Sequence, residues 1–400
     1  MPQKLALRAR TMIWLGFGTM GIMSNAWVPR IPEIKHALGL SNSQFGFALV
    51  GSPIGLLIGT QLSGRIIHRW GSRRIALFSG MELAIAIIFL GMATTRSGLM
   101  FALFLLGFGY SIIDNAMNTQ SVAVEKILDR RYMSGFHGAW SVGALLAASA
   151  GGLLTHVTSA RINIVSAGVG SFVAIIPIVL GLLPDELDGH LGEEGTSAAK
   201  IPLFGKGTGI LWLIGFGLIG CLIPEAGTTD WAGILLHEHM GVASGLDSSA
   251  FIVFALAMIA GRFSGDHLMT KYGAERVVKI GGYVGGSFLA VAIGLGVWLS
   301  SWNLVVALII INLGFAVAGF GIAPMVPAFI SATGKISGIA PSVALARIGL
   351  IGLMAYYVGP VVVGTVADWI NLPVAMGFPC IVLIGAGYLS RTVRAQAQPV

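Results

Sequence analysis

The sequence has little charge. Asp, Glu, Lys and Arg together make up 10% of its 400 residues, whereas a soluble domain has roughly 25%. Hydrophobic residues make up 55%, and the mean hydropathy is +0.85. This composition exceeds what a soluble core requires and excludes an ordinary soluble globular protein. It predicts a membrane protein that crosses the bilayer many times.

Cysteine is also scarce. Cys221 and Cys380 are the two cysteines of the sequence, and both lie inside apolar stretches, so no disulfide framework is expected. No Cys and His residues have the spacing of metal ligands. The sequence also shows no nucleophile and base pattern and no phosphate-binding loop. We therefore expect no metal, no cofactor and no enzymatic activity.

Long apolar stretches dominate the sequence instead. Twelve can be marked, the first at 11–29 and the last at 372–391, and each is close to the ~20 residues that cross the hydrocarbon core. They are too long and continuous for barrel strands, and the 57 glycines suit close helix packing in lipid. The basic segment 4–10 resembles the start of a signal peptide but is followed by no small-residue cleavage site. We predict an all-α membrane protein with twelve transmembrane helices in two six-helix halves.

One long polar segment divides these stretches six and six. It predicts an N-terminal bundle at 1–183, a cytoplasmic linker at 184–207 and a C-terminal bundle at 208–400. Glycines recur between the halves at an offset of 202 residues: Gly18 and Gly220, Gly39 and Gly241, Gly59 and Gly261, Gly71 and Gly273, Gly80 and Gly282. Six spans per half give both copies the same orientation, which predicts a parallel repeat.

The basic residues predict the orientation of the chain. If the N-terminus is cytoplasmic, that side holds most of the 24 Lys and Arg residues. The opposite side holds Arg30, Lys35, Arg96 and Arg161. This asymmetry places both termini in the cytoplasm. The net charge of +7 therefore indicates topology, and no basic stripe interleaved with aromatics predicts a nucleic-acid partner.

Residues 99–125 combine an apolar stretch with a polar face. Polar side chains recur there at steps of three and four, as on one side of a helix: Ser111, Asp114, Asn115, Asn118, Ser121 and Glu125. An unpaired acid at mid-bilayer costs at least ~2.5 to 3.5 kcal/mol, so such residues usually face a bundle interior or a wet cavity. We predict Asp114 as a proton-binding residue, with a structural acid bonded to neighbouring helices as the alternative.

Glu225 is the second acid inside an apolar stretch, and it is either a second proton-coupling residue of the cavity or a structural partner. The candidate substrate-binding residues are Asn25, Trp27, Asn115, Asn118, His137, Trp140, Asn312 and Arg347. Asn25 can donate and accept hydrogen bonds, which suits a hydroxylated or amide-bearing solute. Trp27 either stacks on a sugar ring or anchors the chain at the membrane interface.

Two further candidates have alternatives of their own. His137 either titrates near physiological pH or acts as a hydrogen-bonding wedge at a helix start. Arg347 either neutralises Asp114, binds an anionic group, or extends its head to the cytoplasmic surface. Glu125 is expected in a cytoplasmic gate.

The segment GRIIHRWGSRR resembles the loop motif of the major facilitator superfamily. Gly64, Arg69, Gly71, Arg73 and Arg74 match the motif, and His68 stands where aspartate is usual. The resemblance implies the fold of that superfamily and a gating role for these residues. In the second half, Arg262 and Asp266 form either a latch of the cytoplasmic face or an ordinary helix-end pair.

The segments DNAMNTQSVAVE, MSGFHGAWSVG and IPEAGTTDWAG resemble the bacterial branch related to sugar and fucose permeases. In those permeases, acids on spans four and one serve proton coupling and substrate binding. Asp114 matches the first acid, and Asn25 stands at the second position. The resemblance implies a monomeric inner-membrane transporter that works by alternating access.

The expected partners are a small polar, sugar-like solute, protons and the lipid bilayer. No arginine begins the fourth apolar stretch (99–122), and the fifth (135–157) lacks the proline that is typical of antiporters in this superfamily, which favours import. The alternatives are a proton-driven exporter of amphipathic compounds and a receptor that does not transport.

Overall fold

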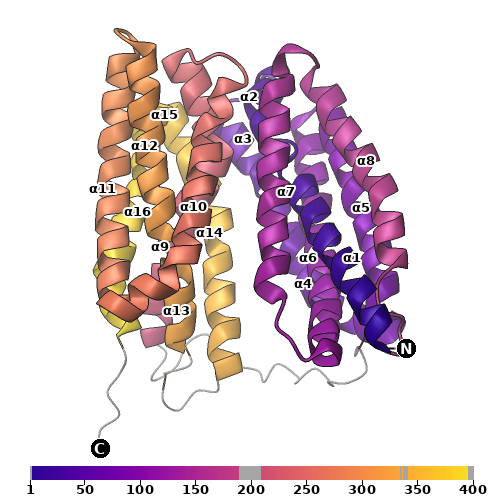
Figure 1. Ribbon diagram of the computed structural model, residues 1–400. Coiled ribbons are helices and arrows are strands. Elements are labelled where there is room, and N and C mark those ends of the chain that lie inside the picture. The colour runs from indigo at the N-terminus through magenta and orange to yellow at the C-terminus, as the bar shows by residue number, and fades with distance from the viewer. Residues whose placement is uncertain (1, 189–208, 334–335, 337–340, 395–400) are drawn as a thin grey trace, which may run out of the picture. The chain divides into compact units, whose positions relative to one another are not determined.

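The computed structural model describes residues 2–188, 209–333, 336 and 341–394, and these residues form helices and no strands (Figure 1). They divide into two compact units. The first unit contains residues 1–40 and 47–197, and the second contains 41–46 and 198–400. The greater part of the predicted linker, residues 189–207, lies outside the described residues.

The first unit is drawn from indigo to magenta in Figure 1. Its six main helices are α1 (Pro2–Asn25), α4 (Gly51–Trp70), α5 (Ser72–Met92), α6 (Arg96–Leu128), α7 (Met133–Leu153) and α8 (Ala160–Leu180). Short elements join them: η1 (Val28–Arg30), α2 (Ile31–Ala37) and η2 (Leu154–His156). Helix α3 (Asn42–Leu49) is divided, because its residues up to Gly46 belong to the second unit. Helix α6 packs against α4 and α5, and α1 packs against α7.

The second unit is drawn in colours that end in orange and yellow. Its main helices are α9 (Gly209–Ile234), α10 (Ser249–Tyr272), α11 (Ala274–Ser300), α12 (Leu304–Ile322), α14 (Pro341–Trp369) and α16 (Gly377–Tyr388). The shorter elements are η3 (Leu235–His239), η4 (Leu246–Ser248), α13 (Met325–Thr333), α15 (Leu372–Ala375) and η5 (Leu389–Val393). Helix α12 packs against α10 and α11, as α6 packs against α4 and α5 in the first unit.

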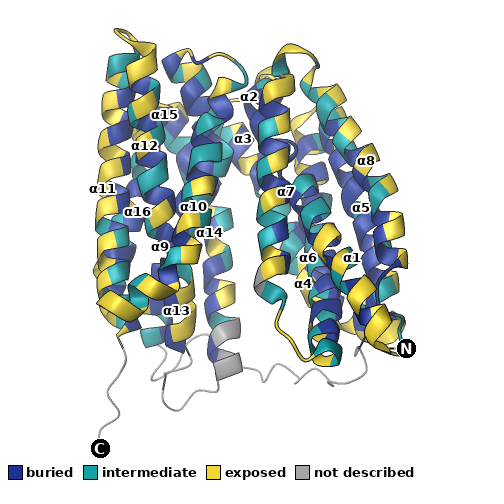
Figure 2. Cartoon of the chain, in the orientation of Figure 1, coloured by how far each residue is buried: buried dark blue, intermediate teal, exposed yellow. Residues whose placement is uncertain are grey.

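These helices form because a chain in lipid must satisfy its own backbone hydrogen bonds. Eleven segments of the described chain are long and apolar enough to cross a membrane, with mean hydropathies from 1.3 to 2.5. The remaining main helix, α1, begins at Pro2 rather than at the predicted residue 11, because the basic residues before the apolar run are also helical. It ends at Asn25, shortly before Pro29 and Pro32. Buried and exposed faces alternate around the helices of each bundle (Figure 2).

The backbone supports the internal repeat. Gly71 joins α4 to α5 with φ 80° and ψ 150°, and Gly273 joins α10 to α11 with φ 82° and ψ 143°. Gly39 and Gly241 also share a positive φ, at 60° and 69°. Residues with a Cβ rarely adopt such angles, so each half uses glycine at the same turns.

The loop motif binds the end of α8 within its own bundle. Arg73 donates to the carbonyl oxygens of Val179 at 3.1 Å and Leu180 at 2.7 Å, where the C-terminal end of a helix favours a cation. Arg74 lies 3.4 Å from Asp185. The buried Asp188 accepts hydrogen bonds from the backbone and hydroxyl of Ser72. The motif therefore ties the start of α5 to the segment after α8.

The contact between α4 and α6 depends on small residues. A Cβ on Gly55 would lie 1.9 Å from the carbonyl oxygen of Phe104, whereas a Cβ on Gly64 of the same helix meets nothing within 4 Å. We expect Gly55→Ala to force the helices apart and to destabilise the bundle by about 1 to 3 kcal/mol. Gly64→Ala is the matched control and should be neutral or stabilise by up to about 1 kcal/mol. Thermal denaturation of the purified variants checks this, and equal melting temperatures would contradict it.

Candidate functional site

Asp114 lies half-buried in the middle of the membrane-spanning helix α6. The side-chain amide of Asn118, one turn later, donates a hydrogen bond of 3.1 Å to its Oδ2. Among the described residues this is the one hydrogen bond that the carboxyl group accepts, although an ionised carboxylate has about four acceptor positions. Hydrogen bonds from the surrounding helices therefore stabilise the charged form of Asp114 only weakly.

His137 lies on α7 within electrostatic range of the Asp114 carboxyl. The buried ring of Phe17 on α1 contacts the imidazole edge to face, with ring centroids 5.0 Å apart. Trp140 lies one turn further along α7, and its buried indole Nε1 has no hydrogen-bond partner among the described residues. Helices α6 and α7 thus contribute Asp114, Asn118 and His137 to one polar region, and α1 packs the ring of Phe17 against it.

Other candidates on these helices serve packing within the bundle. Asn115 follows Asp114 and so points about 100° away around the helix, where its amide donates to Ser63 of α4 at 2.7 Å. Asn25 is buried and donates to the carbonyl oxygen of Gly21. Trp27 is 5% exposed, which disagrees with an anchor at the membrane interface. The polar face expected along α6 is therefore divided between a contact with α4 and the region around Asp114.

Glu125 lies near the end of α6. Its Oε1 accepts hydrogen bonds from the backbone N–H groups of Tyr132 and Met133, the latter at 2.8 Å. Tyr132 and Met133 begin α7. The carboxylate therefore holds the start of α7, where free N–H groups favour an anion.

The second unit contains its own group of polar residues around α9. Glu225 and Asp230 are half-buried on α9, and both lie within electrostatic range of Tyr356 on α14. Arg262 on α10 lies within electrostatic range of Glu225. The bundle thus contains two acids, a phenol and a cation, all on membrane-spanning helices.

The other predictions for the second unit concern the pairing of Arg262 with Asp266 and the roles of Asn312 and Arg347. Arg262 and Asp266 are both exposed and form no ion pair in the described chain, so the predicted latch pair is absent there. Asn312 donates to Ser249 of α10 at 3.1 Å and thereby joins α12 to α10. The Nε of Arg347 is buried and has no hydrogen-bond partner among the described residues.

Glu82 is an intramembrane acid that the sequence analysis missed. It lies in the middle of α5, both of its carboxyl oxygens are buried, and neither has a hydrogen-bond partner among the described residues. Its Oε2 lies so close to α6 that a Cβ on Gly109 would collide with it. The signal was available, because Glu82 is an acid within an apolar stretch, as Asp114 is.

Two similar bundles of membrane-crossing helices, each with half-buried acids inside its spans, are typical of membrane transporters built from internal repeats. The sequence profile of the Major Facilitator Superfamily matches residues 13–343. The chain belongs to this superfamily and is a multi-pass membrane transporter, which confirms the predicted family and fold class.

Relatives of nearly the same length support this assignment. An uncharacterized MFS-type transporter of Yersinia pestis is 31% identical over 95% of this chain and 94% of its own length. The membrane protein MosC of Rhizobium meliloti is 25% identical over 92% of this chain and 86% of its own length.

Solved structures show the same fold at low sequence identity. The nucleoside transporter NupG has a TM-score of 0.78 at 13% identity, over 97% of this chain and 99% of the other. A bacterial homologue of the human lysosomal transporter Spinster, in an inward-facing and unoccupied conformation, has a TM-score of 0.75 at 13% identity and covers 99% of both chains. At this low identity, the two structures show that the chain has the same fold.

Proposed function

We propose that this transporter imports a small polar solute together with protons, by alternating access of its two bundles. The observation that supports this most directly is the environment of Asp114, a half-buried acid in a spanning helix that accepts, among the residues the structure describes, one hydrogen bond, from a neutral amide. Removal from water disfavours the charged form of such a group. Proton binding neutralises Asp114 and lets the loaded transporter reorient without moving a bare charge through lipid.

His137 and Trp140 are proposed as the neighbouring solute contacts. The imidazole of His137 lies near Asp114 and is exposed at the surface of its bundle. Trp140 supplies an indole N–H that has no protein partner among the described residues. The aromatic face of Trp140 can pack on a sugar or base ring, and a hydroxyl or carbonyl group of a solute can accept from the N–H when alternating access exposes it.

In the second bundle, Glu225 is proposed as the second proton-coupling residue and Arg262 as its cationic counterpart. The tyrosine hydroxyl of Tyr356 lies in the same electrostatic group and can both donate and accept a hydrogen bond. A polar solute that is a sugar or a nucleoside offers several hydroxyls to such groups. The structural likeness to a nucleoside transporter adds nucleosides to the sugar-like solutes that the sequence suggests.

The proposed location is the bacterial inner membrane, with both termini in the cytoplasm and the protein as a monomer. The uneven distribution of basic residues supports this orientation. The proposal includes no metal, no cofactor and no catalysis.

A thermal-shift screen of the purified protein tests the proposed function. Hexoses, pentoses and nucleosides are added at two pH values, because a true ligand stabilises the folded state by mass action. We expect one of these classes to raise the melting temperature, with a larger shift at the lower pH, since binding together with a proton is favoured there. A stabilising hydrophobic cation with the opposite pH dependence would favour export of amphipathic compounds and would overturn the proposal.

A further inference from the structure

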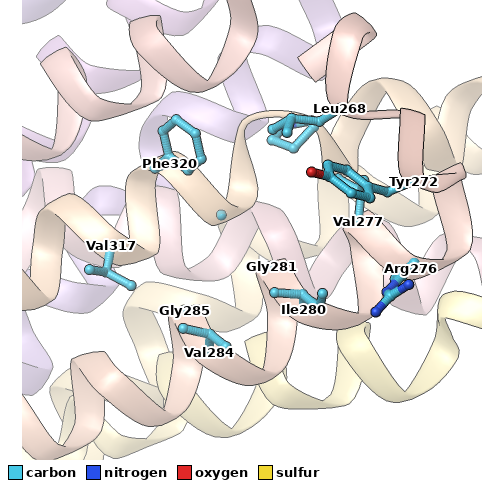
Figure 3. A pocket seen from close by; sticks show the side chains of 12 residues that line it. Leu268, Tyr272, Arg276, Val277, Ile280, Gly281, Val284, Gly285, Val317 and Phe320 are labelled. Atoms are coloured by element: carbon cyan, nitrogen blue, oxygen red, sulfur yellow. The ribbon is translucent and has the colours of Figure 1, made fainter. Parts of the chain in front are cut away.

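A groove of about 350 Å³ lies on the second bundle between α10, α11 and α12 (Figure 3). Its walls are largely apolar and include Val284, Phe320 and Tyr272, which are 41% to 49% exposed. Its base is formed where α11 and α12 cross at glycine. A Cβ on Gly281 would lie 2.6 Å from the carbonyl oxygen of Gly321, so the helices meet backbone to backbone and no side chain fills the crossing.

One end of this groove is basic. Figure 3 shows Arg276 at one end of the lining residues and Val317 at the other. A second hollow of about 830 Å³ shares Tyr272, Arg276, Ile280 and Val284 with the first. It adds the charged residues Lys279, Glu275 and Arg394. Glu275 forms an ion pair of 2.6 Å with Arg394. Arg276 and Lys279 are exposed and form no ion pair in the part of the chain that the structure describes.

The two hollows therefore continue into one another but differ in chemistry. The first offers exposed apolar walls on a membrane-spanning bundle, and the second adds the exposed Lys279 beside the shared, exposed Arg276 near the start of α11. A sugar fits the first poorly, because its hydroxyls would lose their hydrogen bonds to water there. A molecule with an apolar chain and an anionic head satisfies both. Basic hollows between membrane helices bind anionic lipid head groups in this way.

We propose that this composite site binds one anionic glycerophospholipid of the bilayer. An acyl chain lies in the groove against Val284 and Phe320, and the phosphate lies between the guanidinium of Arg276 and the ammonium of Lys279. Neither Glu225 nor Asn312 lines either of the two hollows. The composite site is a lipid site and not part of the proposed solute path.

The test measures lipid binding to the purified full-length protein. Dioleoylphosphatidylglycerol, dioleoylphosphatidylcholine and inorganic phosphate are titrated separately, with native mass spectrometry of bound lipid and the melting temperature as readouts. We expect phosphatidylglycerol to bind more tightly than phosphatidylcholine and to raise the melting temperature of the protein more. Inorganic phosphate alone should have little effect. Arg276→Gln combined with Lys279→Gln should weaken the binding of phosphatidylglycerol by about thirty-fold. Each substitution removes one basic side chain that attracts the anionic head group, and the two losses multiply.

Two further variants separate the site from general effects. Val284→Trp fills the groove and should weaken binding without any change of charge. Arg96→Gln removes an exposed basic residue of the first bundle and should leave lipid binding unchanged. Equal binding of both lipids, equal stabilisation by phosphate alone, or unchanged binding in both Val284→Trp and the double variant would overturn the assignment.

Discussion

Asp114→Asn is expected to abolish the accumulation of solute that a proton gradient drives in reconstituted vesicles. The driving force at stake is large, because one charge moving through 100 mV is worth ~2.3 kcal/mol. At ~1.4 kcal/mol per decade this supports roughly fifty-fold accumulation before any pH difference is added. Asparagine keeps the size and the hydrogen-bonding capacity of the side chain but cannot take up a proton, so exchange of labelled for unlabelled solute should continue.

The matched control is Asp129→Asn at the end of the same helix. Asp129 is exposed and has a φ of 47°, a conformation that asparagine also adopts readily. This variant makes the same chemical change outside the membrane-spanning part and should accumulate solute as the unaltered protein does. Normal uphill uptake by Asp114→Asn would exclude Asp114 as the coupling residue.

Arg30→Met is expected to destabilise the first bundle by about 1 to 3 kcal/mol, because it leaves part-buried hydrogen-bond acceptors at Thr158 and Asn163 and the partly exposed carboxylate of Glu33 without their donor. The Arg30 side chain is fully buried, and its Nη1 lies 2.7 Å from Oε1 of Glu33. Its Nη2 donates to the carbonyl and hydroxyl oxygens of Thr158, and its Nε donates to Asn163. One guanidinium thus joins the segment after α1 to the start of α8.

Thermal denaturation of the purified variants measures this effect. Arg161→Met, an exposed arginine near the start of α8, is the control and should change stability by less than about 1 kcal/mol. The double variant Arg30→Met with Glu33→Leu should recover part of the loss, since it removes the orphaned charge. A melting temperature for Arg30→Met equal to that of Arg161→Met would show that the buried contacts contribute little.

Hydropathy predicted the helices well because the bilayer permits few alternatives for an apolar chain. The ends of helices were harder to predict. Helix α1 begins nine residues before its apolar stretch. Lys4, Arg8 and Arg10 are compatible with a helix, but their charge places them outside the apolar stretch that hydropathy detects. The glycine offset was informative because Gly71 and Gly273 are required by the same turn in each half.

The site could be predicted where its contacts follow helical spacing. Asp114 and Asn118 are one turn apart, and the structure joins them by a hydrogen bond. Neighbouring Asn115 was assigned to the same face, although its contact with Ser63 depends on the packing of α4, which sequence spacing does not specify. Phe17 behind His137 is likewise visible only in three dimensions, because the two residues lie far apart in the chain.

Contacts between distant segments explain the other misses. Gln120 donates to Ser72 and to the carbonyl oxygen of Leu183, and its Oε1 accepts from the backbone of Leu183. Nothing in the sequence around Gln120 indicates these partners. The roles of Arg30 and of Tyr356 depend in the same way on helix packing, whereas Glu82 was a missed intramembrane acid that its surroundings alone could have identified.

The most direct test of the central claim is the movement of protons with solute. Vesicles that contain the purified protein and an internal pH dye receive an inward gradient of the solute that the thermal-shift screen identifies, with no pH gradient and the membrane potential clamped at zero. The account predicts that the vesicle interior becomes more acidic in the unaltered protein and in Asp129→Asn, but not in Asp114→Asn. Solute uptake by the unaltered protein without any change of internal pH, or with alkalinisation, would contradict it.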